Sequence, residues 1–240
     1  MIKLSYDMHI HSCLSPCGDD DMTPANIAGM AHINGLDVIA LTDHNSCLNC
    51  PAIVSQAQKY GIIAIPGAEI TTSEEIHMLC LFETLEDALD FGRHIYECLP
   101  NIINQDRIFG RQQIVDEEDN PAGCIDKLLI NAASISIDDL PAAAASYNGI
   151  CIPAHINKPS DSILSVFGVI PPTAEFNIAE INRCDDINAL MQKHEYLRKC
   201  RIISDSDAHY LTDINEPVNY IETREKSIES IFESLRTNKS

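Results

Sequence analysis

The chain has 240 residues, of which 45% are hydrophobic and 22% are charged, so it can bury the core of one large α/β domain. Its 36 acidic and 16 basic residues give a formal net charge of −20, a negative field that argues against general nucleic-acid binding or attachment to anionic lipid. No apolar run approaches the roughly 18 residues of a membrane span, and the first residues lack the apolar stretch of a signal peptide. We therefore expect a cytoplasmic protein with no membrane partner, for which nucleic acid is disfavoured as a partner.

Ten cysteines raise the question of a disulfide framework. Such frameworks serve small secreted domains without a core, whereas Cys80, Cys151 and Cys200 lie in apolar, strand-like runs. Buried free thiols in a reducing compartment are the better interpretation. Cys47 and Cys50 form a single C-x-x-C pair, and because a zinc ribbon needs a second pair, we interpret them as an incidental loop pair, with a redox role as the alternative.

Short apolar runs alternate with longer amphipathic runs along the chain, which is the pattern of repeated βα units. Thr23 and Pro24 predict the start of the first helix, and Gly35 predicts its end. The expected strands cover residues 3–10, 36–41, 62–67, 75–82, 150–154, 176–181, 201–204 and 218–221, and the expected helices cover residues 24–34, 52–60, 85–99, 125–133, 137–147 and 226–235. Residues 100–121 have no clear period, so we interpret residues 100–147 as an irregular and helical insertion within a single domain of residues 1–240.

Histidines and carboxylates recur at one kind of place, the C-terminal part of a predicted strand or the turn that follows it. The residues at such places are His9, His11, His44, Glu69, His77, His155, Asp207 and His209. One histidine at a strand end is more often hydrogen-bonded than a ligand, and His32, His94 and His194 fall in predicted helices and are given no role. The recurrence on successive strands is different, because strand C-termini of a parallel α/β barrel converge on one mouth. The pattern therefore predicts a metal site there.

Imidazole and carboxylate ligands without a required thiolate suit borderline divalent ions such as Zn, Mn or Fe. The ligands are too many for one tetrahedral ion, so we expect two or three ions that share a bridging carboxylate. Clustered ions of this kind activate water and stabilise charge on a phosphoryl or acyl group.

The run of motifs resembles the PHP (polymerase and histidinol phosphatase) family. The resemblance rests on motifs in the family's order, namely His9-x-His11, Thr42-Asp43-His44, Gly67-Ala68-Glu69, His77, Ala154-His155 and Asp207-x-His209. Each motif is weak alone, but together they are specific and span nearly the whole chain. The resemblance implies a distorted (β/α)7 barrel with a trinuclear metal cluster at the C-terminal mouth of the strands, and phosphoester hydrolysis.

Carried over by position, the resemblance also implies ligand sets. The first ion would use His9, His11, Glu69 and Asp207, the second would use Glu69, His77 and His155, and the third would use His44, His209 and a residue of the loop after the first strand. The family usually has Asp or His in that loop, whereas this sequence has Pro16 and Cys17 at the corresponding positions. Counting forward from the second histidine points to Cys17, and counting back from the helix start points to Asp19. We favour Asp19, because its carboxylate resembles the usual ligand.

Our leading hypothesis is a metal-dependent phosphoesterase that hydrolyses a small phosphorylated metabolite or nucleotide through a metal-activated water. A cation should also hold the phosphate, and the candidates are Arg111 in the insertion, Lys158 and Arg183. His209 or Asp43 would orient the water or protonate the leaving group, and Asp43 could equally fix an imidazole tautomer.

Three alternatives remain beside this hypothesis. The first is a nuclease acting on nucleic-acid ends, against which the net charge and the lack of a basic stripe count. The second is a metal-binding regulatory module without turnover, which the near-complete ligand set disfavours. The third is an amidohydrolase-type barrel, which typically has a carbamylated lysine at a strand end, a position that no lysine occupies here. The sequence does not predict the oligomeric state.

Overall fold

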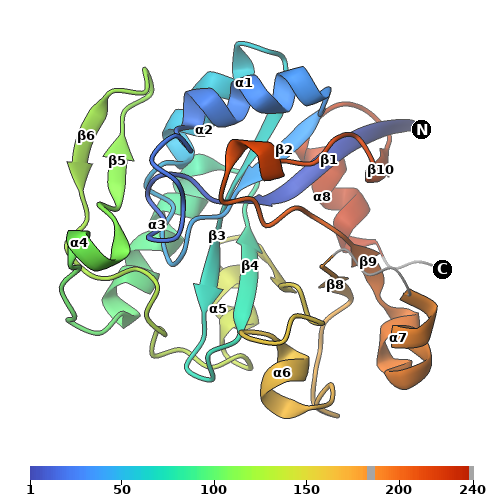
Figure 1. Ribbon diagram of the computed structural model, residues 1–240. Coiled ribbons are helices and arrows are strands. Elements are labelled where there is room, and N and C mark those ends of the chain that lie inside the picture. Colours follow the sequence, from blue (N-terminus) through green and yellow to red (C-terminus); the bar gives the residue numbers. More distant parts are fainter. Residues whose placement is uncertain (183–186, 238–240) are drawn as a thin grey trace.

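The computed structural model describes residues 1–182 and 187–237, which adopt a mixed α/β fold around a curled sheet that forms half of a barrel (Figure 1). The main sheet has the strand order β10-β1-β2-β3-β4-β7, with the bounds β10 (Tyr220–Thr223), β1 (Ile2–Ile10), β2 (Val38–Leu41), β3 (Ile63–Thr71), β4 (His77–Leu81) and β7 (Ile150–Pro153). Two smaller sheets pair β5 (Gln113–Val115) with β6 (Pro121–Cys124) and β8 (Ile178–Glu180) with β9 (Arg201–Ile203).

The helices lie around this sheet (Figure 1). They are α1 (Pro24–Asn34), α2 (Cys50–Gln58), α3 (Leu85–Cys98), α4 (Asp106–Phe109), α5 (Leu140–Ser146), α6 (Ile163–Phe167), α7 (Ile187–Lys193) and α8 (Ile228–Arg236), with 3-10 helices at Glu195–Lys199 and Leu211–Asp213. The side chain of Thr23 accepts the Asn26 N–H at the start of α1, and Gly35 ends this helix in a left-handed conformation, as the sequence predicts. Among the described helices, none combines the length and the apolar character needed to cross a bilayer.

Strand β1 carries apolar side chains on one face of the sheet and polar side chains of the candidate site on the other. Leu4, Tyr6 and Met8 pack into a buried cluster with side chains of the neighbouring strands and of α8. Successive side chains of a strand point to opposite faces, so Asp7 and His9 lie on the other face and are also buried. Because β1, β2 and β3 are parallel, their C-terminal ends meet at one edge of the sheet.

The strand directions differ from the expected (β/α)7 barrel. Strand β4 runs antiparallel to both β3 and β7, and β10 runs antiparallel to β1. A short turn joins β3 to β4, and a connection of that length cannot make a parallel crossover, so the two strands form a hairpin in which Thr71 pairs with His77. His77 is therefore the first residue of its strand rather than near its end, and it still lies at the edge that carries the C-terminus of β3.

The insertion is also different from the prediction. Residues 125–133 form no helix. The Gln112 side chain hydrogen-bonds their backbone groups instead: its amide N–H groups donate to the carbonyls of Ile125 and Lys127, and its Oε1 accepts the Leu129 N–H. A hairpin of β5 and β6 precedes this segment, and the helix expected over residues 137–147 forms as the shorter α5. The Asn49 side chain ties β5 to the rest of the molecule by accepting the Val115 N–H at 3.0 Å.

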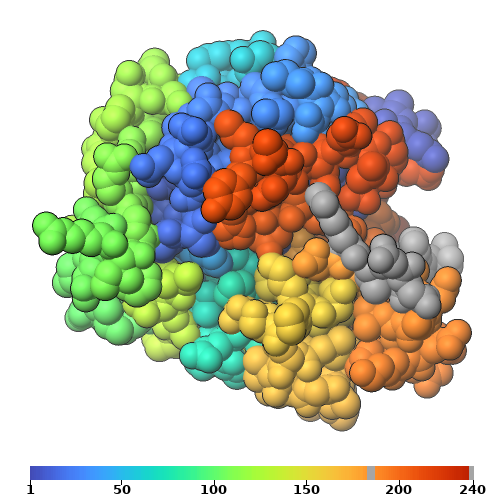
Figure 2. Space-filling model, viewed as in Figure 1, coloured from blue at the N-terminus to red at the C-terminus, as the bar shows by residue number. Residues whose placement is uncertain are grey.

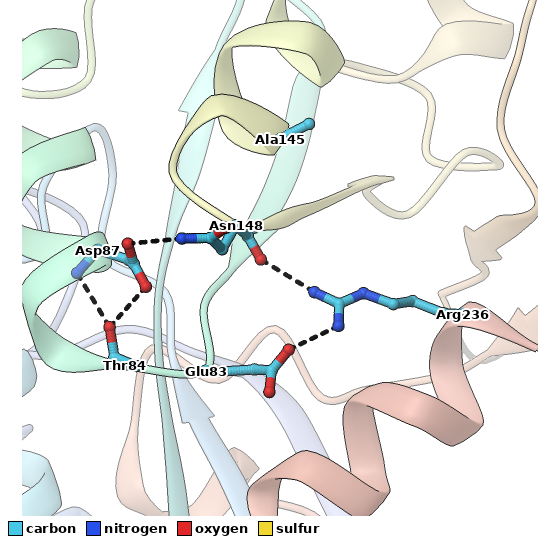
Figure 3. Close-up of a pocket in the computed structure, with 7 residues that line it drawn as sticks. Glu83, Thr84, Asp87, Ala145, Asn148 and Arg236 are labelled. Carbon is cyan, nitrogen blue, oxygen red and sulfur yellow. Dashed lines mark hydrogen bonds and ion pairs between the residues drawn. The ribbon is translucent and has the colours of Figure 1, made fainter.

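A surface hollow of about 540 Å³ marks the opposite end of the sheet, beyond the last residue of β4 (Figure 3). It is lined by Glu83, Thr84, Asp87, Ala145, Asn148, Gly149 and Arg236. Arg236 at the end of α8 donates to Glu83 Oε1 at 2.6 Å and to the Asn148 carbonyl at 3.0 Å, which braces the last helix against two loops. The lining holds none of the predicted ligands, so we assign this hollow a structural role.

Gly149, beside this hollow, has no room for a side chain. A Cβ at this position would lie 2.4 Å from Phe82 Cε1 and 2.8 Å from Phe82 Cδ1. Gly149→Ala is therefore expected to lower the free energy of unfolding by about 1–3 kcal/mol. Chemical denaturation measures this, with Gly29→Ala in α1 as the control, because its Cβ would meet nothing nearer than the Tyr60 hydroxyl at 3.8 Å. Equal stability of the two variants would contradict the packing argument.

Candidate metal centre

The carboxylate of Glu69, on β3, lies at the centre of the predicted ligand set and is almost fully buried, at 1% exposure. Five imidazole nitrogens surround it, at distances of 3.3 Å for His9 Nε2, 3.4 Å for His11 Nε2, 3.2 Å for His44 Nδ1, 3.0 Å for His77 Nδ1 and 3.0 Å for His155 Nε2. Imidazoles from four separate parts of the sequence therefore meet around one carboxylate.

Strand register accounts for this convergence. His9 and His11 follow each other at a spacing of two, which places both side chains on the same face of the β1 end. His44, in the turn after β2, forms a parallel bridge with Glu69. His77 enters from the β3–β4 hairpin, and its carbonyl accepts the Ala154 N–H next to His155.

Asp207 and His209 close the site from the segment after β9. Ala208 bridges to Ile10 in parallel, and this pairing brings Asp207 Oδ1 to 3.3 Å from His9 Nε2 and 3.2 Å from His11 Nε2. Figure 2 shows exposed parts of the loop after β1, in blue, beside the segment after β9, in orange-red.

Two of the ligand candidates have an unusual backbone. His155 has a φ of 27° and Asp207 has a φ of 54°, in the left-handed region that side chains other than glycine rarely adopt. Such conformations cost about 1–3 kcal/mol each and cluster at functional sites. The fold therefore holds His155 and Asp207 in strained backbone conformations that place their side chains in the centre.

Three overlapping groups of side chains bring their ligand atoms within 4.8 Å of one another: His9, His11, Glu69 and Asp207; His44, Glu69 and His77; and His11, Cys17, His44 and His209. The first group matches the first expected ligand set. The second group contains His44 rather than His155, although His155 Nε2 lies 3.0 Å from Glu69. The third group contains His44 and His209 as expected.

The loop residue of the third group is Cys17, whereas we favoured Asp19. The Asp19 carboxylate accepts the backbone N–H of Asp21 at 2.9 Å, in an Asx turn that leads into α1. Asp19 belongs to none of the three groups, which were found among the described residues. The preference for the harder ligand did not take account of the path of this loop.

Charge in the site is arranged around Glu69. Burial raises the pKa of Glu69, but His77, His9 and His44 outweigh burial and hold this pKa well below its ordinary value. Burial lowers the pKa of His9, while Glu180, Asp207 and Glu69 together raise it well above the ordinary value. The pKa of His44 lies well below the ordinary value, mainly because of burial. The surroundings of Glu69 thus shift the pKa values of neighbouring imidazoles in opposite directions.

The residues fit divalent ions. Within residues 1–182 and 187–237, His44 Nδ1 and His155 Nδ1 are buried without a hydrogen-bond partner, a costly condition for imidazole nitrogens. Imidazole, carboxylate and thiol donors of this kind suit Zn, Fe or Co better than Mg or Ca. The donor set and the unpartnered nitrogens are consistent with a site built for metal.

Glu180, at the end of β8, supports the centre and was missed in the sequence analysis. Its Oε1 and Oε2 lie 2.9 Å and 3.1 Å from His9 Nδ1, and Oε2 accepts the His155 N–H at 2.7 Å. Carboxylates in this position hold a ligating imidazole in one orientation and one tautomer. The sequence did contain an indication, namely a glutamate near the end of the strand predicted over residues 176–181. A pattern defined mainly by histidines overlooks it.

Asp43 lies too deep to contact a substrate. Its Oδ1 accepts the Ser12 N–H and the Ser15 hydroxyl, and its Oδ2 accepts the Ser12 hydroxyl. The Ser15 hydroxyl in turn lies 3.1 Å from His11 Nδ1. This arrangement favours the tautomer-fixing role over that of a general acid or base.

The three expected phosphate-binding cations have different surroundings. Lys158 Nζ pairs with Asp207 Oδ2 at the edge of the centre, with its side chain 30% exposed. Arg111 Nη2 pairs with Asp20 at 3.1 Å, and both side chains are largely exposed. Arg183 lies outside the described residues. Lys158 is therefore the cation that the geometry brings to the site.

Cys47 and Cys50 lie apart from the candidate ligands. Both thiols are buried in the apolar cluster that includes Phe91 and Cys80, and Cys50 Sγ donates to the Gly67 carbonyl at 3.4 Å. None of the three ligand groups found among the described residues includes either thiol. The pair thus packs as part of the core.

Comparison with protein families gives a match to the PHP domain over residues 7–201. Among solved structures, a lesion-specific endonuclease from Pyrococcus furiosus, PfuEndoQ, superposes with a TM-score of 0.68 at 19% identity, over 96% of this chain and 55% of that chain. A protein from Bifidobacterium adolescentis assigned as a metal-dependent phosphoesterase superposes with a TM-score of 0.60 at 17% identity, over 95% of this chain and 96% of that chain. At these identities the superpositions show a shared fold.

Among curated proteins, a 5'-3' exoribonuclease of Haemophilus influenzae is 34% identical over 79 residues, which cover 32% of this chain and 28% of that protein. This chain therefore spans little more than half of the endonuclease, and the match to the exoribonuclease covers less than a third of that protein.

One comparison corrects the expectation about partners. A structure of Endonuclease Q with a 27-mer duplex that has an abasic lesion at the active site superposes on 98% of this chain with a TM-score of 0.66. Disfavouring nucleic acid on net charge was wrong, because net charge averages over the molecule whereas binding depends on the charge at the site. The duplex in that structure is bound by a protein that shares this fold at 18% identity and of which this chain covers 57%.

Proposed function

Because this chain belongs to the PHP domain family of metal-dependent hydrolases, we propose that it is a metal-dependent phosphoesterase that cleaves phosphodiesters at the ends of nucleic-acid strands. The observation that carries the proposal is the convergence of five imidazoles on the Glu69 carboxylate, with Asp207 beside them. Support for the substrate comes from the fold shared with Endonuclease Q and from the stretch similar to an exoribonuclease.

Divalent ions held in this centre would lower the pKa of water and neutralise the developing charge on the phosphoryl group. His9, His11, Glu69 and Asp207 would hold one ion, and His44, His77 and His155 would complete the positions on the other side of Glu69. Glu180 keeps the His9 Nδ1–H engaged, so that Nε2 faces the centre. This burial of ligands and their partners keeps the donors in place before a substrate arrives.

Lys158 and His209 lie at the more exposed side of the centre, where a substrate would approach. The Lys158 ammonium stands at the open side of Asp207, where it can donate to a phosphate oxygen. The His209 side chain is 25% exposed and its Nδ1 lies 2.8 Å from the Asp207 carbonyl, which leaves Nε2 directed elsewhere, toward an ion or the leaving oxygen. Lys158 lies in the loop after β7, and His209 lies in the segment after β9.

The acidity of the chain fits this proposal if recognition is local. Divalent ions and Lys158 concentrate positive charge at the centre, whereas the remaining negative surface repels the distant part of a long polyanion. Such a field favours strand ends or short strands over the middle of a long duplex.

The test is a set of hydrolysis assays with metal-reconstituted protein. The substrates are single-stranded RNA and DNA labelled at either end, a duplex with an abasic lesion, and simple phosphomonoesters and phosphodiesters. We expect stepwise shortening of a labelled strand that stops when a chelator is added. Cleavage of only the small esters would move the substrate class to small molecules, and no hydrolysis of any substrate by fully loaded protein would contradict the proposal.

Lys158→Ala separates substrate binding from metal binding. Loss of one charge-assisted hydrogen bond to phosphate should lower kcat/KM roughly 10-fold, while the number of bound ions stays unchanged. Lys3→Ala is the matched control, because that ammonium pairs with Glu222 on the exposed β1–β10 edge. If Lys158→Ala leaves kcat/KM at the wild-type value, Lys158 does not bind the phosphate.

A further inference from the structure

The loop after β1 brings a thiol to the centre, at the position where the resemblance implies an oxygen or nitrogen ligand. We propose that the Cys17 thiolate, with His44 and His209, completes a mixed thiolate–imidazole metal position that binds Zn or Co in preference to Mn. The inference rests on the metal dependence in the proposed function, but it is independent of the substrate.

Backbone hydrogen bonds fix where Cys17 lies. The Ser15 N–H donates to the Ser12 carbonyl and the Gly18 N–H donates to the Ser15 carbonyl, each at 3.0 Å, so the loop turns twice in succession. The Asp19 N–H then donates to the His209 carbonyl, also at 3.0 Å. Cys17 stands directly before these last two contacts, so the loop holds it beside His209.

The loop cannot relax away from this path. The buried Asp43 carboxylate accepts hydrogen bonds from the Ser12 N–H and from the Ser15 hydroxyl, and so anchors both residues. At Gly18 the backbone passes so close to the Ser12 carbonyl that a Cβ would lie 2.3 Å from that oxygen. A buried carboxylate and a required glycine therefore set the position of the thiol.

The imidazoles of this group point independently to an ion. The rings of His11 and His209 stack with centroids 4.4 Å apart, and those of His11 and His44 lie 4.6 Å apart. His44 Nδ1 is buried and lacks a hydrogen bond within the part of the chain that the structure describes. Three imidazoles packed around a thiol leave nitrogens that a cation would satisfy.

Ligand chemistry sets the metal preference. A thiolate carries the same charge as a carboxylate but is softer, and soft donors favour Zn or Co over Mn or Mg. The other two groups consist of imidazole and carboxylate donors and lack a thiol. The three positions should therefore differ in the metals they accept.

Cobalt substitution tests the ligand directly, because a thiolate bound to Co(II) gives a near-ultraviolet charge-transfer band that imidazole and carboxylate ligands lack. We expect the band in the wild-type protein and in Cys124→Ser, a control at an exposed thiol on β6. Cys17→Asp should keep the number of bound ions and lose the band, whereas Cys17→Ala should bind one ion fewer per chain. Asp19→Ala should match the wild type.

A band that persists in Cys17→Asp, or the loss of one ion in Asp19→Ala with none lost in Cys17→Ala, overturns the inference. Alkylation gives a second readout without activity: zinc should protect Cys17 from iodoacetamide, measured by mass spectrometry of the intact, folded protein, while Cys124 reacts with or without zinc. Equal labelling of Cys17 in both conditions also overturns it. A protein that shows the band but cleaves no nucleic acid would refute the substrate proposal alone.

Discussion

Glu69→Gln is expected to remove bound metal and to lower phosphoesterase activity by more than about 100-fold, which exceeds the usual effect of residues that only support metal ligands. The reason is that five imidazoles from four separate segments approach this one carboxylate within 3.4 Å. The amide has the same shape but no negative charge, so it would hold divalent ions far less tightly. Metal analysis of the purified protein and initial rates measure the two effects.

Glu75→Gln is the control for this substitution. Glu75 is exposed on the same β3–β4 hairpin and undergoes the same chemical change without contact to the centre. We expect wild-type metal content and activity from it. A Glu69→Gln protein that still binds its ions and turns over substrate at the wild-type rate would refute the assignment of the centre.

Glu180→Gln should weaken metal binding about 10- to 100-fold and leave catalysis by the loaded protein nearly intact. The carboxylate accepts from His9 Nδ1 and from the His155 N–H, so it positions two ligands without belonging to any of the three candidate groups. The amide of glutamine would direct N–H toward one of these donors and leave it unpaired. Metal titration followed by assays at low and at saturating metal checks this.

Rescue by added metal is the distinguishing outcome for Glu180. A positioning role predicts that saturating metal restores most of the activity, whereas general disruption of the fold would leave the activity low at any metal concentration. Glu175→Gln, at an exposed position before the same strand, should behave as the wild type. Unchanged metal affinity in Glu180→Gln would contradict the role proposed for this carboxylate.

Most of the strands and the residues that converge on Glu69 could be predicted from the sequence, because both depend on local pattern. The alternation of apolar and polar residues in β1 and the recurrence of histidines at strand ends are visible without any tertiary information. The direction of β4 was harder, since a strand looks the same in either direction and only the short turn before His77 shows the hairpin.

The remaining differences arise from contacts between distant residues. Cys17 rather than Asp19 faces the centre because Asp43, far along the chain, anchors the loop through Ser12 and Ser15. Residues 125–133 have helical spacing, but the Gln112 side chain satisfies their backbone groups in an extended path. A single sequence does not show that Asp43 and Gln112 contact these distant segments. Local propensity alone therefore predicts a helix over residues 125–133 that does not form.

The pairing of Ala208 with Ile10, which closes the centre, affects when the protein can bind its metal during folding. Its ligands lie between His9 and His209, and the pairing of Ala208 with Ile10 joins segments 198 residues apart. Contacts of such sequence separation form late, because a long loop must close before they add stability. A nascent chain cannot assemble the whole ligand set until residue 209 has left the ribosome, so full metal loading reports that the segment after β9 has paired with the end of β1.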